Sequence, residues 1–139
     1  MHAPKNSSTT IQTTPQAAFE AVLGVVQNGK YDLRGVNNET RSLVFLKGMT
    51  ALSWGTMYLV DVTSDGSGAR VNVLVGGRDD APKALLDGWK HGKAASKLLS
   101  EVEAVATGTT SAPASRVESF AKLDDGREVP WDGSEFPTG

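Results

Sequence analysis

Four segments between residues 31 and 75 carry the β-branched and aromatic residues that are typical of strands, and only short turns separate them. Asn37-Asn38 tolerates a positive φ and suits a hairpin, and Asp65-Gly66-Ser67-Gly68 suits a hairpin loop that contains glycine. Because strands joined by short turns pair antiparallel, this region is expected to form one antiparallel sheet. The expected strands cover residues 31–36, 42–47, 54–63 and 70–75.

One amphipathic segment precedes these strands and a longer one follows them. After a β-branched strand at residues 8–13, Thr14 and Pro15 supply an N-cap hydroxyl and a proline at the first helical position. Asn28-Gly29 is typical of a left-handed C-cap, so the first helix is expected over residues 15–28. A second helix is expected over residues 81–106, where Gly88 and Gly92 would permit close packing. Its apolar stripe is expected to contain Leu85, Trp89, Gly92, Ser96, Leu99, Val102 and Ala106.

The order of these elements is β-α-β-β-β-β-α. It predicts an α+β fold with one curved antiparallel sheet and two helices, the longer helix at the C-terminal end. A stretch of small polar residues begins at Thr107, and residues 107–139 hold three basic and six acidic side chains. The sequence therefore predicts a flexible N-terminus over residues 1–7, a single domain over residues 8–106 and a flexible acidic tail over residues 107–139.

Composition excludes several classes of function. The chain has no cysteine, which excludes disulfides, thiol nucleophiles and thiolate metal sites. Its only histidines are His2 and His91, too few ligands for a histidine metal cluster. We therefore expect no metal and no other cofactor. A net charge of -2 offers no general attraction for nucleic acid or an anionic membrane, and no apolar run approaches the roughly 20 residues of a membrane-spanning helix. Since residues 1–6 lack the apolar core of a secretory signal, a cytoplasmic location is expected.

Three local sequence patterns resemble those of a known group of folds. They are Ser53-Trp54-Gly55 at the start of the longest expected strand, the valine-rich strand at residues 70–75, and Leu86-Asp87-Gly88-Trp89-Lys90-His91-Gly92-Lys93 in the last helix. Together with the element order, they resemble small bacterial domains of the helix-grip group, which includes the SRPBCC superfamily and TATA-binding-protein-like folds. The resemblance covers residues 8–106. It implies a cupped sheet that grips a long C-terminal helix and sometimes encloses an apolar ligand, and it implies no particular activity.

The sequence offers no recognisable combination of acid, base and nucleophile, so we do not expect an enzyme. Asp87 and His91 share a helical face and could act as orienter and general base, but a solvated charge pair is the favoured interpretation. Asp79-Asp80 is interpreted as complementing a helix dipole rather than binding a metal. Gly76-Gly77-Arg78 is interpreted as the end of a strand rather than a phosphate-binding loop. A lysine stripe, interpreted as a solvated helix face, contains Lys83, Lys90, Lys93 and Lys97.

Alternation along the strands places apolar residues on both faces of the expected sheet. Val73 and Leu74 lie on opposite faces, as do Phe45 and Val44. If both helices cover one face, the second face needs a cover as well. That cover could be a ligand, a second subunit or the tail, unless strong curvature of the sheet buries both sides. The apolar residues that the tail could contribute are Phe120, Leu123, Trp131 and Phe136.

Two hypotheses of function follow from the predicted fold and its apolar sheet faces. The first is a non-enzymatic binding domain for a small apolar ligand, held between the sheet and the long helix. The second is a protein-interaction or homodimerisation module that uses the exposed sheet face. Neither hypothesis involves nucleic acid or a membrane. The aromatic side chains expected to line the ligand site, unless they are simply core, are Tyr31, Phe45, Trp54, Tyr58 and Trp89.

Overall fold

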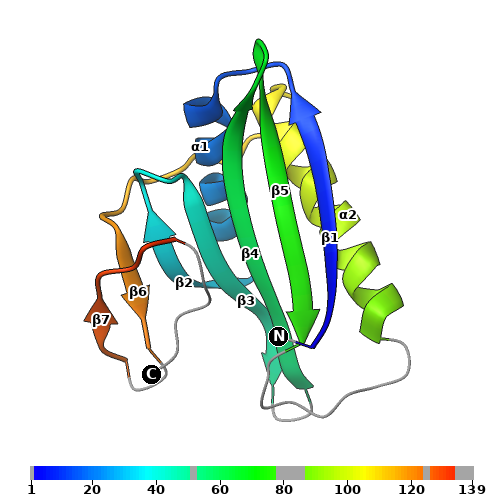
Figure 1. The fold of residues 1–139 in the computed structure, drawn as a ribbon, viewed down its shortest axis with the longest axis vertical. Helices are drawn as coiled ribbons and strands as arrows, with labels where there is room; N and C mark the ends of the chain where they lie inside the picture. Colours follow the sequence, from blue (N-terminus) through cyan, green and yellow to red (C-terminus); the bar gives the residue numbers. More distant parts are fainter. Residues whose placement is uncertain (1, 51–52, 78–86, 124–125, 134–139) are drawn as a thin grey trace.

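The computed structural model describes residues 2–50, 53–77, 87–123 and 126–133. Seven strands form one sheet in the order β1-β5-β4-β3-β2-β6-β7, and every neighbouring pair is antiparallel (Figure 1). The strands are β1 (His2–Ile11), β2 (Tyr31–Asn37), β3 (Ser42–Thr50), β4 (Ser53–Asp65), β5 (Gly68–Gly77), β6 (Phe120–Lys122) and β7 (Glu128–Val129). Strands β2 to β5 occur where the β-branched and aromatic segments predicted them, and each extends beyond its predicted range.

Helix α1 (Pro15–Asn28) has the predicted bounds. The Thr14 hydroxyl accepts a hydrogen bond from the Ala17 amide, which satisfies one of the free donors of the first turn. At the other end, the prediction of a left-handed C-cap is wrong, because Gly29 has a φ of -98°. The reason for glycine there is space: a Cβ atom would lie 2.9 Å from the Tyr31 ring.

Helix α2 (Asp87–Ala106) is described from Asp87, and the predicted start at residue 81 lies outside the described residues. Its buried stripe differs from the predicted one by about one residue at several positions: Leu99 and Val102 are buried as expected, but Ser96 is exposed. Gly92 has open space around its Cα, so it does not serve close packing. The stripe that faces the core contains His91, Ala95, Leu98, Leu99 and Val102.

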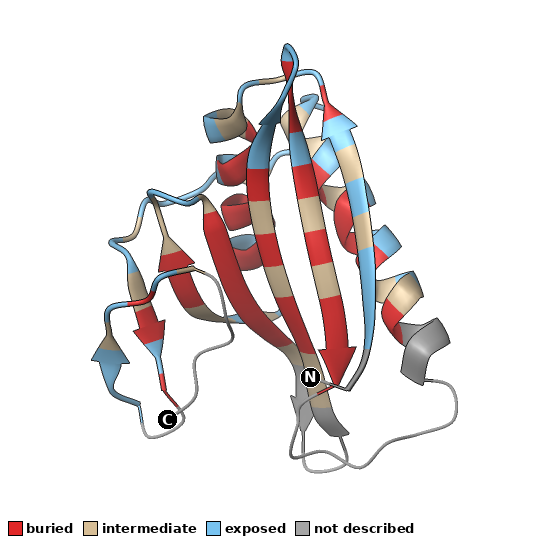
Figure 2. Cartoon of the chain, in the orientation of Figure 1, coloured by how far each residue is buried: buried red, intermediate tan, exposed pale blue. Residues whose placement is uncertain are grey.

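Both helices lie on one face of the sheet (Figure 1). Helix α1 contacts β2 to β5, and α2 contacts β1, β5 and α1. Buried and less buried residues alternate along β4 and β5, as the red and tan bands of Figure 2 show. One core fills the space between sheet and helices. The protein therefore has the predicted α+β architecture, with a single antiparallel sheet that carries two helices.

The two predicted hairpin turns use different chemistry. Asp65 pairs with Gly68 across the predicted glycine turn, in which Gly66 has a φ of 60°. The turn between β2 and β3 was expected to place a positive φ at Asn37 or Asn38, but the positive φ, 53°, belongs to Arg41. Asn37 acts through its side chain instead, because its amide oxygen accepts hydrogen bonds from the backbone of Glu39 and Thr40.

Beyond α2, residues 107–119 cross the outer side of α1, and we call them the strap (Figure 1). Gln27 holds the strap by two hydrogen bonds of 2.7 Å to the backbone of Ser115, and Asn28 donates to the Pro113 carbonyl. A Cβ atom at Gly24 would collide with the carbonyl oxygen of Ala112, so glycine permits this close approach.

The chain extends the sheet at both of its ends beyond the predicted domain over residues 8–106. Strand β1 begins at His2, where residues 1–7 were expected to be flexible, and Lys5 pairs with Val75. Strand β6 follows the strap and pairs with β2, through Ala121 and Gly35. The predicted flexibility of both ends concerns motion and stays a prediction. Within the described residues, neither helix combines the length and apolar character that crossing a membrane requires.

Candidate ligand-binding site

Three of the predicted aromatic side chains meet on the helix-covered face of the sheet. Tyr31 on β2, Phe45 on β3 and Tyr58 on β4 lie on adjacent strands, and Phe45 pairs directly with Tyr58 in the register. The Phe45 and Tyr58 rings stack with centroids 4.9 Å apart, and the Tyr31 ring meets both edge-on, at 5.1 and 5.6 Å. We call these three side chains the aromatic cluster.

The members of the aromatic cluster differ in burial. Phe45 and Tyr58 are core residues, with 0% and 3% of their surface exposed. Tyr31 is partly exposed, and the Lys47 ammonium lies 4.9 Å from the centroid of its ring. Tyr31 is therefore the member of the cluster that a ligand can approach.

Burial also sets the protonation of the two phenols. Burial raises the pKa of Tyr31, and the nearby carboxylate of Glu101 and the Tyr58 phenol raise it further. Burial and Glu101 together raise the pKa of Tyr58 to about 12. Both phenols are consequently neutral at physiological pH and available as hydrogen-bond donors. The carboxylate that acts on both phenols belongs to α2.

A pocket of about 490 Å³ opens beside this cluster, and we call it the helix pocket. It is formed by the end of α1, the second half of α2 and the first part of the strap. Two of its lining residues connect it with Tyr31: Gly29 lies against the Tyr31 ring, and Glu101 perturbs the Tyr31 phenol. The lining consists of Val25, Asn28, Gly29, Ser100, Glu101, Ala104, Val105, Thr110, Ser111 and Ala112.

The predicted site residues coincide with this pocket only in part. Tyr31 lies next to its lining, whereas Phe45 and Tyr58 pack into the core behind it. The side chains of Trp54 and Trp89 lie outside the described residues, although their backbones belong to β4 and to the first turn of α2. Whether any of the five side chains binds a ligand stays a prediction.

Sequence reasoning missed the residues that line the helix pocket. Those on α2, such as Ser100, Ala104 and Val105, carried no chemical signal, because small residues beside an apolar stripe are common on helices. Their role depends on the path of the strap, which no local pattern predicts. An indirect signal was the pair of glycines in α1 and at its end, Gly24 and Gly29, since both sit at close approaches.

The structure describes some of the other candidate residues. His91 is 3% exposed, so interpreting it as half of a solvated charge pair is wrong. Gly76 and Gly77 end β5 opposite Met57 and Thr56, as expected of a strand end. Asp79-Asp80 lies outside the described residues. Among those that are described, no three histidine or carboxylate side chains are grouped to hold a metal ion.

The second face of the sheet is covered at one end by the chain itself. Trp131, 9% exposed, and Ala121 pack against Val44, which is fully buried. A Cβ atom at Gly35 would lie 2.7 Å from Val44 and 3.2 Å from the Trp131 ring, so a larger residue would disturb this contact. The Trp131 carbonyl accepts a hydrogen bond from the Asn37 side chain. The sequence left a ligand, a second subunit or the tail as possible covers of this face. At this end of the sheet, Ala121 and Trp131 of the tail cover it.

Comparison with known proteins identifies the fold and leaves the family open. No protein-family model matches the chain, and no curated protein matches it by sequence. Among solved structures it is similar to Ara h 8.0201, with 10% identity, a TM-score of 0.55 and coverage of 76% of this chain and 97% of that one. It is also similar to the Aha1 dimer from Colwellia psychrerythraea, with 14% identity, a TM-score of 0.52 and coverage of 77% and 98%. The chain therefore has the helix-grip fold that its element order and local patterns predicted.

Proposed function

We propose that the protein is a non-enzymatic binding domain for a small, mainly apolar molecule, which it holds in the helix pocket beside Tyr31. The observation that carries the proposal is the pocket of about 490 Å³ where α1, α2 and the strap meet. This volume falls within the range of about 300 to 1,000 Å³ that ligand sites occupy. The helix-grip fold shared with Ara h 8.0201 and Aha1 fits a binding domain in general.

The lining suggests the chemistry of the ligand. Val25, Ala104, Val105 and Ala112 offer apolar surface, and Glu101 is the one charged residue among those that line the pocket. A carboxylate in such a place accepts a hydrogen bond and disfavours an anion. The preferred ligand is therefore an apolar molecule with a hydroxyl or amino group, rather than a fatty acid.

Amide NMR of the full chain tests this proposal with 2-naphthol, with naphthalene as the analogue without a donor, and with laurate. The expected result is a saturable shift at Gly29 and at residues 100–105 and 110–112, with 2-naphthol binding more tightly than the other two. The Ala104→Phe variant fills the pocket and should lose the shift, whereas Ser96→Phe, on an exposed position of the same helix, should keep it. Failure of 2-naphthol to produce a saturable shift in these residues would refute the proposal.

Homodimerisation through the second face of the sheet is the alternative. Leu59 and Leu74 pair across β4 and β5 on that face, and both are only partly buried. If two chains associate there, the sedimentation mass rises with concentration and Leu74→Glu makes the protein monomeric while it stays folded. A monomer at high micromolar concentration argues against this alternative and leaves the binding proposal intact.

A further inference from the structure

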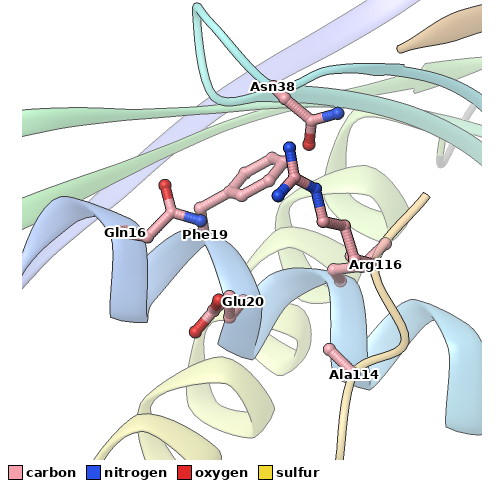
Figure 3. A pocket seen from close by; sticks show the side chains of 7 residues that line it. Gln16, Phe19, Glu20, Asn38, Ala114 and Arg116 are labelled. Carbon is pink, nitrogen blue, oxygen red and sulfur yellow. The ribbon is translucent and has the colours of Figure 1, made fainter. Parts of the chain in front are cut away.

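A second pocket, of about 280 Å³, lies along α1 between Gln16 and Leu23, whereas the helix pocket lies at the end of that helix, and we call the second one the strap pocket. It is enclosed by the first half of α1, the turn between β2 and β3, and the strap. Figure 3 shows Arg116 reaching from the strap toward Phe19 and Asn38, with Gln16 and Glu20 along α1. The lining consists of Gln16, Phe19, Glu20, Leu23, Asn38, Ala114 and Arg116.

The walls of the strap pocket are held in place by other contacts. Phe19 and Leu23 belong to the core, with 2% and 3% of their surface exposed, so they form a fixed apolar floor. The Asn38 side chain donates a hydrogen bond of 2.9 Å to the Val117 carbonyl, which ties the turn to the strap. Two hydrogen bonds between Gln27 and Ser115 fix the strap between its two lining residues. The floor and the backbone of the strap are therefore preformed, so the ordering that a ligand imposes is confined to the exposed side chains of the pocket.

Two side chains of opposite charge, Glu20 and Arg116, line this pocket. Within the described part of the chain, neither Arg116 nor Glu20 takes part in a hydrogen bond or an ion pair. A guanidinium can bind a carboxylate through two parallel hydrogen bonds, and a carboxylate can accept from an ammonium group. The apolar floor of Phe19 and Leu23 lies with them in the same lining.

We propose that the strap pocket binds a small aliphatic amino acid as its zwitterion. Arg116 takes the carboxylate, Glu20 takes the ammonium group, and the side chain rests on Phe19 and Leu23. The volume of about 280 Å³ is close to the lower end of ligand sites, about 300 Å³, which favours a molecule of this size. The proposal is independent of the ligand in the helix pocket, because the two pockets share no lining residue.

Titrations of the full chain with L-valine, 3-methylbutanoate and isobutylamine test the proposal, since each analogue lacks one of the two charged groups of valine. Valine is expected to give saturable amide shifts at Gln16 to Glu20, at Asn38 and at residues 114–116. Because Arg116 and Glu20 are exposed, each analogue should bind about fivefold more weakly. Equal affinity for all three compounds, shifts confined to the helix pocket, or no saturable shift would overturn the proposal.

Variants separate the two charges. Arg116→Gln should weaken valine about fivefold and leave isobutylamine unchanged, whereas Glu20→Gln should weaken valine by a similar factor and leave 3-methylbutanoate unchanged. Lys122→Gln removes an exposed charge of β6 that lines neither pocket, and it serves as the control. Unchanged valine affinity in both pocket variants, with native amide spectra, would also overturn the proposal.

Discussion

At the scale of single residues, two helical glycines with opposite surroundings provide a matched test of the strap. Gly24→Ala places a methyl group against the Ala112 carbonyl, whereas Gly92→Ala places one in open space. Alanine favours a helix interior over glycine by about 1 kcal/mol, so Gly92→Ala should raise the free energy of unfolding by up to that amount. Overpacking costs about 1 to 3 kcal/mol, which exceeds this gain in helix propensity. Gly24→Ala should therefore lower the free energy of unfolding by about 1 kcal/mol. Urea unfolding measures both, and equal stabilisation would show that the strap does not press on α1.

The two tyrosines provide a second test, because Tyr31 and Tyr58 are the only tyrosines in the chain. The unfolded chain ionises its phenols near pH 10, whereas burial and Glu101 raise both native pKa values, that of Tyr58 to about 12. The native state therefore retains protons that the unfolded state releases, and its stability should fall as the pH rises from 10 through 12. Phenolate absorbance should stay absent at pH 10 until denaturant is added. In Glu101→Gln it should appear at lower pH, and a native titration near pH 10 would contradict this account.

At the scale of elements, local signals predicted the parts of the fold that local chemistry decides. Thr14 and Pro15 predicted the start of α1, and segments rich in β-branched and aromatic residues predicted the four central strands. Strand β6 could not be predicted in this way, because its three residues have no pattern of their own and depend on pairing with β2. The helix pocket could not be predicted for the same reason. Its walls come from α1, α2 and the strap, which lie together only because of tertiary packing.

The turn between β2 and β3 is expected to couple two elements through one side chain. Asn37 accepts from the amides of Glu39 and Thr40 and donates to the carbonyl of Trp131. Asn37→Ala removes all three hydrogen bonds and should lower the free energy of unfolding by about 1 to 3 kcal/mol. It should also shift the amide signals around Trp131. Glu39→Ala, in the same exposed turn, is the control, and comparable losses in both variants would show that the Asn37 contacts contribute little.

At the scale of the whole molecule, the packing of Trp131 on Val44 leads us to expect that β6, β7 and Trp131 belong to the folded unit, whereas composition predicts a flexible tail over residues 107–139. A chain that ends at Ser119 keeps the strap but loses β6, β7 and the cover of Val44. Uncovering this apolar surface should lower the free energy of unfolding by about 3 kcal/mol, and Trp131→Ala in the full chain by about 2 kcal/mol. Glu128→Ala, on an exposed position of β7, should change it little. Amide relaxation decides the matter independently: values at Ala121 and Trp131 that match those of β3 support docking, whereas fast motion there together with unchanged stability of the shortened chain would establish the flexible tail.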